Sequence, residues 1–251
     1  QDVELINTRV VGPNLLLPSL EELQGANVTY ACATNADRNL ICDNIFLNVL
    51  KKGNPKKIES FQVPSNVVII KGIFFNLKGG EEKSINYHRI IWNKCGDDNV
   101  RCGNNQNIIR IDPCLKLFVG CSLMVNTNDH KKIGMVKGTT LNFKGIILKE
   151  GKNLKVELWH EYKVYTVEAK DVEMLVCENP ASMEIAPKNL VYIPSNFFQV
   201  SIKYPINATD FINMAKTKIL QFPVNNDLAT TGHKLQGMTK KFIIVSQLNY
   251  S

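Results

Sequence analysis

The sequence predicts an α/β domain that is interrupted by a β-rich insertion in the form of a small barrel. A strand-like apolar run at residues 28–33 leads into an amphipathic helical pattern at 36–50. Short β-like runs with glycine or charged turns between them fill most of residues 115–176, and helical periodicity returns at 210–220. A strand followed by a helix is typical of an α/β layer, and short strands with close turns are typical of a small barrel.

The first predicted strand ends where a helix is expected to begin. Thr34 and Asn35 follow the run VTYACA and offer an N-cap for the helix at residues 36–50. Such a junction presents backbone N–H groups at which phosphate binds readily. A capped helix without a ligand is the commoner structure, so both interpretations stay open at this point.

The middle of the chain reads as β-structure. Residues 61–118 consist of short β-rich runs broken by glycine and asparagine, with a polar turn at 79–83. The pattern places further strands at residues 115–125, 139–148, 154–160, 162–167 and 197–204. Residues 222–228 indicate a polar-capped helix or a turn, and residues 242–245 indicate a final strand.

Composition limits the class of protein and of partner. The chain is 44% apolar and 21% charged, which is ordinary for a globular protein. No apolar run reaches the roughly 18 residues that a bilayer span requires, so we expect no membrane partner. The net charge of +7, from 30 basic and 23 acidic side chains, favours a polyanionic partner, although many basic proteins bind no nucleic acid.

Cysteine and histidine spacing predicts neither a metal site nor a disulfide framework. An odd number of cysteines spread along the chain argues against a disulfide framework and favours a reducing compartment, and the lack of a CxxC pair argues against zinc. The seven cysteines stand at positions 32, 42, 95, 102, 114, 121 and 177. His88, His130 and His160 lack acidic or cysteine partners at ligand spacing, so we expect them on the surface or in the core. Trp92 and Trp159 are able to stack on bases, but core packing is the commoner role.

A cluster of polar donors stands near the C-terminal end, in the segment ATTGHKLQGMT. Within it, Thr231, His233 and Lys234 supply hydroxyl, imidazole and ammonium donors, each able to hold a phosphate oxygen. Gln236 and Gly237 add an amide and a close backbone approach, which suit contact with a nucleotide.

This segment resembles motif V of superfamily-one helicases of the RecD and Pif (petite integration frequency) type, A-x-T-x-H-K-x-Q-G-x-T. Every fixed position of that motif is matched, from Ala229 to Thr239. The resemblance implies that DNA is contacted by Thr231, His233, Lys234 and Thr239. It implies a nucleotide cleft at Gln236, Gly237, Asn35 and Arg38, with a helix-surface position as the alternative for the arginine.

Other stretches resemble the same family in the same order. Residues 2–10 and 30–39 resemble the entry to the second RecA-like domain of these helicases. Residues 115–128, LKLFVGCSLMVNTN, resemble the family run L-K-L-x-x-G-x-x-V-M-x-x-x-N. In the following GMVKGT, Lys137 replaces the usual asparagine, which puts the turn there in doubt.

The resemblance implies the second RecA-like motor domain of an ATP-dependent DNA helicase that moves 5′ to 3′, interrupted by the small barrel. We divide the chain into residues 1–126, an insertion at 127–220 and a return to the motor core at 221–251. The implied partners are single-stranded DNA or DNA junctions and the missing first RecA-like domain. A nuclear or mitochondrial location follows from the same resemblance.

The 251 residues contain no G-x-x-x-x-G-K-[ST] phosphate loop, no Walker-type acidic pair after an apolar strand and no Ser-Arg motif for an arginine finger. We therefore expect ATP and Mg²⁺ to bind the full-length parent, and this fragment alone to contain no catalytic residue and no metal. The alternative is a non-catalytic, single-stranded-DNA-binding remnant of a mobile-element helicase. A third interpretation is a β-rich protein-interaction domain with a chance motif.

Overall fold

The computed structural model describes residues 28–32, 35–53, 66–93, 101–103, 111–128, 135–182, 189–205, 211–231 and 242–245. The first strands are β1 Val28–Cys32, β2 Val67–Lys71, β3 Ile73–Phe75, β4 Arg101–Gly103, β5 Cys114–Phe118, β6 Ser122–Val125, β7 Thr140–Leu148 and β8 Lys155–Trp159. The later strands are β9 Tyr162–Glu168, β10 Val172–Glu178, β11 Leu190–Pro194, β12 Asn196–Pro205, β13 Phe211–Gln221, β14 Val224–Asn226, β15 Ala229–Thr231 and β16 Phe242–Val245. The helices are α3 Asn35–Gly53, α4 Ile85–Asn93 and the 3-10 turn η2 Ala169–Asp171.

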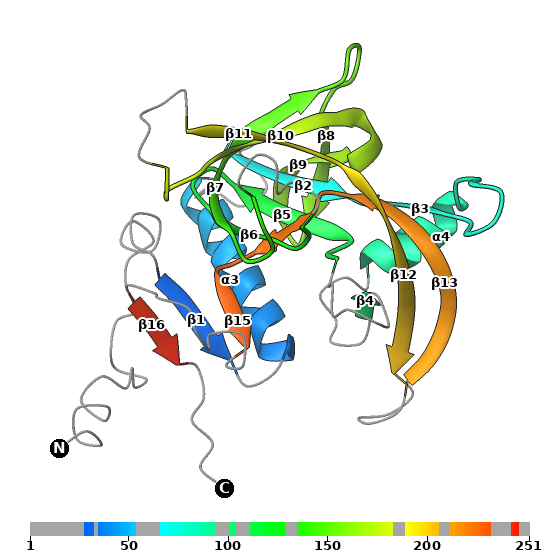
Figure 1. The fold of residues 1–251 in the computed structure, drawn as a ribbon, viewed down its shortest axis with the longest axis horizontal. Coiled ribbons are helices and arrows are strands. Elements are labelled where there is room, and N and C mark those ends of the chain that lie inside the picture. Colours follow the sequence, from blue (N-terminus) through cyan, green and yellow to red (C-terminus); the bar gives the residue numbers. More distant parts are fainter. Residues whose placement is uncertain are drawn as a thin grey trace, which may run out of the picture.

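A small parallel sheet forms the α/β part of the molecule (Figure 1). Strand β1 lies in its centre, with β15 on one side and β16 on the other, and both pairings are parallel. Helix α3 packs against β1 and β15 and buries Phe46, Val49 and Leu50. The strand and the helix that the sequence predicts at residues 28–33 and 36–50 are confirmed.

Three further sheets make the rest of the described chain mostly β-structure. Their strand orders are β11-β10-β7-β6-β14, β3-β13-β12-β4 and β5-β2-β9-β8. The predicted strands at 139–148, 154–160, 162–167 and 197–204 are confirmed by β7, β8, β9 and β12. Neither helix in the described part of the chain is long and apolar enough to span a bilayer.

The helix predicted at residues 210–220 is wrong, because this segment is the long strand β13. It pairs with β12 over nearly its whole length, and the two form the long curved hairpin at the right of Figure 1. Burial follows the period of a strand: Thr217 and Ile219 are buried, whereas the preceding residue, Lys216, is exposed. The apolar residues of the segment fit both periods, and the antiparallel partner decides between them.

Helix α4 stands where the sequence predicts only β-rich runs. Ser84 caps it, since its hydroxyl accepts a hydrogen bond from the backbone N–H of Tyr87 at 3.3 Å. His88 and Ile91, three positions apart, form its buried face. The cap and this spacing were the signals for the helix that the β-rich reading overlooked.

The helix or turn predicted at residues 222–228 is also wrong in part, because strand β14 lies there and pairs with β6. At the last residue of β13 the side chain of Gln221 is fully buried. Its Nε2 donates to the carbonyl of Asp112 at 3.0 Å, and its Oε1 accepts from the backbone N–H of Phe222 at 3.0 Å. Gln221 therefore joins the chain at this crossing to the start of β5.

The division of the chain at residues 126/127 and 220/221 stays a prediction. Sheets join strands from both sides of each boundary: β2 pairs with β9 across 126/127, and β6 pairs with β14 across 220/221.

The polar turn predicted at 79–83 contains Gly79 and Gly80, both with positive φ.

We predict that Gln221→Leu destabilises the fold by about 1–3 kcal/mol, because it leaves the Asp112 carbonyl and the Phe222 N–H buried without these partners. Urea unfolding measures this change. The control is Gln199→Leu on β12, where the side chain is exposed and the expected change stays within about 0.5 kcal/mol. Equal effects of the two substitutions would contradict a structural role for the buried amide.

Candidate nucleic-acid interface

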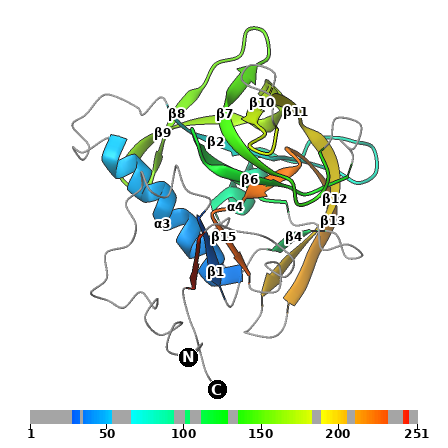
Figure 2. The same ribbon diagram turned by 60° about the vertical axis from the view of Figure 1, so that its left-hand side comes forward.

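The parallel sheet brings two of the predicted segments to one edge. Because β1 and β15 are parallel, their carboxyl ends meet, and Cys32 of β1 lies opposite Thr231 of β15. Helix α3 begins at Asn35, directly beyond this edge, and lies alongside the sheet in Figure 2. Ligands of α/β sheets bind at the carboxyl ends of the strands, where a helix start offers free N–H groups. The structure thus places the backbones of Thr231 and Asn35 together at such an edge.

Arg38 stands in the first turn of α3 and is only 7% exposed. Its Nη2 donates to Asn39 Oδ1 at 3.2 Å, whereas its Nε has no hydrogen-bond partner. A buried guanidinium with an unused N–H donor is costly unless an anion or another acceptor meets it. Burial excludes the helix-surface position for Arg38, and its role toward a nucleotide stays a prediction.

The rest of the resembling segment lies outside the described residues. It holds His233, Lys234, Gln236, Gly237 and Thr239, and their predicted roles stay predictions.

The turn at Lys137 lies within the described residues. Gly138 adopts a φ of 95°, and the backbone N–H of Lys137 donates to Asn128 Oδ1 at 2.9 Å. The turn therefore forms with lysine in the place of the family's asparagine.

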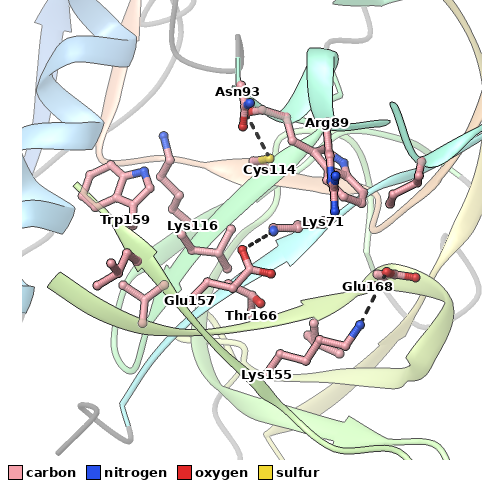
Figure 3. A pocket seen from close by; sticks show the side chains of 16 residues that line it. Lys71, Arg89, Asn93, Cys114, Lys116, Lys155, Glu157, Trp159, Thr166 and Glu168 are labelled. Atoms are coloured by element: carbon pink, nitrogen blue, oxygen red, sulfur yellow. Dashed lines mark hydrogen bonds and ion pairs between the residues drawn. The ribbon is translucent and has the colours of Figure 1, made fainter. Parts of the chain in front are cut away.

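A pocket of about 490 Å³ lies on one face of the sheet β5-β2-β9-β8. Its walls come from all four strands and from α4, and Figure 3 shows Trp159 on one side, Arg89 on the other, and Lys71 with Glu157 between them. Sixteen residues line it: Ile69, Lys71, Ile85, Arg89, Trp92, Asn93, Cys114, Lys116, Lys155, Glu157, Leu158, Trp159, Val164, Thr166, Val167 and Glu168. The pocket therefore combines cations, carboxylates and both indole rings of the chain.

The first lysine of the pocket, Lys71, forms an ion pair with Glu157. Burial alone raises the pKa of Glu157, but the Lys71 ammonium and the Thr166 hydroxyl outweigh burial and hold that pKa below its usual value. The Lys71 ammonium also lies 5.0 Å from the centroid of the Trp92 ring. The indole is itself held in place, because its Nε1 donates to the Gly72 carbonyl at 2.9 Å.

The second lysine, Lys116, repeats this arrangement at the other end of the pocket. It forms an ion pair with Asp43 of α3, and its ammonium lies 5.3 Å from the centroid of the Trp159 ring. Burial alone lowers the pKa of Lys116, but the Asp43 and Asp112 carboxylates outweigh burial and hold it above its usual value. Lys116 therefore keeps its charge although it is buried.

Both tryptophans were expected mainly in the core, yet both line this pocket while packing on one side. The Trp159 ring meets Phe46 of α3 edge-on, with centroids 5.1 Å apart.

His88 is a core residue whose ring nitrogens both have partners: Nε2 accepts from the Phe74 N–H at 2.9 Å, and Nδ1 lies 2.9 Å from the Ser84 carbonyl. The side chain of His160 is exposed. These histidine positions agree with the sequence-based expectation.

Thiol and metal chemistry find little support among the described residues. Burial raises the pKa of the Cys121 and Cys177 thiols to about 12, which keeps both protonated. Five cysteines in the described ranges form no disulfide. The described ranges contain no group of three or more histidine, cysteine, aspartate or glutamate side chains placed to hold a metal.

Of the known proteins compared with this chain, only solved structures are similar to it. No family model and no curated protein matches the chain. Among solved structures, a Pif1 helicase from Candida albicans is 14% identical with a TM-score of 0.47, over 98% of this chain and 43% of that one. A Bacteroides Pif1 bound to ssDNA is 15% identical with a TM-score of 0.33, over 92% of this chain and 43% of that one. The chain spans less than half the length of these helicases, so the activity of a whole helicase belongs to the proposal below.

Sequence reasoning overlooked the charged residues of the pocket, although a signal was present. Lys116 stands inside the run CLKLF, in which every residue is buried, and Lys71 ends the apolar run VVIIK. A lysine within an apolar strand needs a carboxylate partner or contact of its ammonium group with water. Each of these two positions therefore indicates a polar site beside the strand.

We predict that Glu157→Gln lowers stability by about 1 kcal/mol or less at neutral pH, because the Lys71 pair is partly exposed to solvent. The lowered pKa of Glu157 means that its contribution is complete above the unfolded carboxyl pKa of about 4.3 and is lost as the pH falls through the folded pKa. Urea unfolding of both proteins at neutral and at acidic pH checks this. Glu173→Gln, at an exposed position on β10, is the control. A difference that persists unchanged in acid would refute the ion pair as its source.

Proposed function

We propose that this chain is the second RecA-like motor domain of an ATP-dependent DNA helicase of the Pif type, with a β-rich small-barrel insertion, and that it grips single-stranded DNA. The observation that carries the proposal is the segment ATTGHKLQGMT, whose first three residues form β15. Strand β15 ends beside β1, at the edge where α3 begins. A motif with this sequence therefore starts at the part of an α/β sheet that binds ligands.

In this proposal the DNA-binding residues are Thr231, His233, Lys234 and Thr239. Their hydroxyl, imidazole and ammonium groups donate hydrogen bonds to phosphate oxygens of the strand. Such contacts recognise the backbone and not the base sequence, as a motor that moves along any sequence requires. Movement in the 5′ to 3′ direction is part of the same proposal.

The nucleotide cleft would be formed on this side by Gln236, Gly237, Asn35 and Arg38. The unused Nε donor of buried Arg38, at the start of α3, fits the negative charge of a nucleotide phosphate. Bound ATP with Mg²⁺ would supply the free energy for movement, and the phosphate loop for it would belong to the first RecA-like domain. The residues of this chain bind and orient; the proposal gives no reacting group to these 251 residues.

Nucleotide binding would close the two motor domains on each other, and the change in grip would advance the strand. The parent protein would act in the nucleus or the mitochondrion on single strands or DNA junctions. A second candidate is a non-catalytic, single-stranded-DNA-binding remnant of a mobile-element helicase. The departure at Lys137 from the family pattern favours it, and both candidates share the same DNA contacts.

We predict that the double variant His233→Ala, Lys234→Ala binds oligothymidylate more weakly and with a smaller dependence on salt. On single strands, log affinity changes by about 0.7 per neutralised phosphate against log salt concentration, so the slope falls by about that amount for each lost contact. Fluorescence anisotropy titrations over a range of salt concentrations measure both quantities. Lys163→Ala on β9 serves as the control for the loss of one positive charge. Unchanged affinity and slope in the double variant would sink the DNA-contact assignment.

We predict that pyrophosphate raises the melting temperature of the wild type and not that of Arg38→Met. A ligand that binds the folded state at one hundred times its Kd stabilises it by about 2.7 kcal/mol. Sodium chloride at matched ionic strength controls for screening, and Lys163→Met on β9, at a residue that does not line the pocket, controls for the loss of one positive charge. Equal pyrophosphate shifts in the wild type and in Arg38→Met would remove Arg38 from the cleft.

A further inference from the structure

The pocket on the sheet β5-β2-β9-β8 is a continuous strip of one sheet face. Most of its strand residues stand at alternate positions, which share a face, such as Lys71 with Ile69, and Thr166 with Val164. Cross-strand neighbours continue the strip, because Lys116 lies opposite Ile69, which in turn lies opposite Thr166. The pocket therefore crosses all four strands and is not a gap at one loop.

Two indole rings stand in this strip, one from α4 and one from β8. Trp92 is oriented by its hydrogen bond to the Gly72 carbonyl, and Trp159 by its edge contact with Phe46. Both rings are only partly buried and both line the pocket. Oriented aromatic rings in a basic groove are the means by which proteins hold single-stranded nucleic acid without sequence preference, because every base has a π-face.

The lining of the pocket carries more cations than carboxylates, and Asp43 behind it pairs with Lys116. Four cations line it against two carboxylates, namely Lys71, Lys116, Lys155 and Arg89 against Glu157 and Glu168. Among the three lysines that line the pocket, Lys155 is the most exposed, with 68% of its side chain open to solvent. Its Nζ lies 3.9 Å from a carboxylate oxygen of Glu168, at the limit of an ion pair. Arg89 is exposed on α4. Lys155 and Arg89 are thus placed to meet phosphates, while Lys71 and Lys116 lie beside the indoles.

We propose that this pocket is a second contact for single-stranded nucleic acid, in which bases stack on Trp92 and Trp159. The ammonium groups of Lys71 and Lys116 donate to base carbonyl oxygens, and Lys155 and Arg89 contact the phosphates. A volume of about 490 Å³ lies within the range of small-ligand pockets, which is enough for a short piece of the strand and not for a duplex. The inference rests on the proposed function for the identity of the ligand, but it uses different residues.

Intrinsic fluorescence reports on this pocket alone, because the chain has two tryptophans and both line it. The probe is a short oligothymidylate, and the comparison is an abasic oligonucleotide with the same number of phosphates. Oligothymidylate is expected to quench the fluorescence and to bind more tightly than the abasic strand. Equal affinity for the two strands, or no quenching, overturns the stacking proposal.

Trp159→Ala is expected to weaken oligothymidylate binding roughly 5- to 150-fold and to leave the abasic strand unaffected. Lys155→Glu, at an exposed position that does not threaten the fold, is expected to weaken binding of both strands. The control is Lys163→Glu, which makes the same change of charge on β9 at a residue that does not line the pocket. It is expected to weaken the binding of each strand less than Lys155→Glu does. If Lys155→Glu and Lys163→Glu act equally, the phosphate contact is overturned.

The two proposals fail separately. If the His233→Ala, Lys234→Ala variant loses both strands while Trp159→Ala keeps the preference for bases, the pocket proposal is overturned and the motif contact stands. If that double variant binds normally while Trp159→Ala loses the preference for bases, the motif contact is overturned and the pocket stands.

Discussion

The buried amide of Gln221 is the constraint on which the arrangement of the last third of the chain depends. The chain leaves the β12–β13 hairpin at this residue and enters the five-stranded sheet through β14. The Gln221 side chain donates to the Asp112 carbonyl, just before β5, and accepts from the N–H of Phe222. The end of β13 is thereby joined to the start of β5 at one buried point. Strands β14 and β15 follow this crossing along the chain.

Helix α3 links the two regions to which we assign ligand contacts. Its first turn lies at the carboxyl edge of the parallel sheet and contains the buried Arg38. Further along, Asp43 pairs with Lys116 and Phe46 packs on Trp159, so the same helix forms part of the support of the pocket. A rigid helix of 19 residues thus fixes the distance between the edge and the pocket.

Local pattern was enough to predict β1, α3 and most strands, because a strand that meets a capped helix has a distinct sequence signature. It failed at β13, whose apolar residues fit both a helix and a strand, and where pairing with β12 decides. The ligand edge that the motif predicts stays a prediction, because most of that motif lies outside the described residues. The pocket could not be predicted from local pattern, because its walls come from α4 and from strands that pair over long distances in the sequence, as β2 does with β5 and β9.

The central position of β1 has a consequence for biosynthesis. Both of its hydrogen-bonding neighbours, β15 and β16, follow it by about 200 residues. At ribosomal rates of about 5–20 residues per second, roughly 10–40 s pass in which neither edge of β1 has its native partner. A nascent chain in this state is an aggregation hazard, and its maturation should depend on a chaperone that shields this first α/β unit until the last strands emerge.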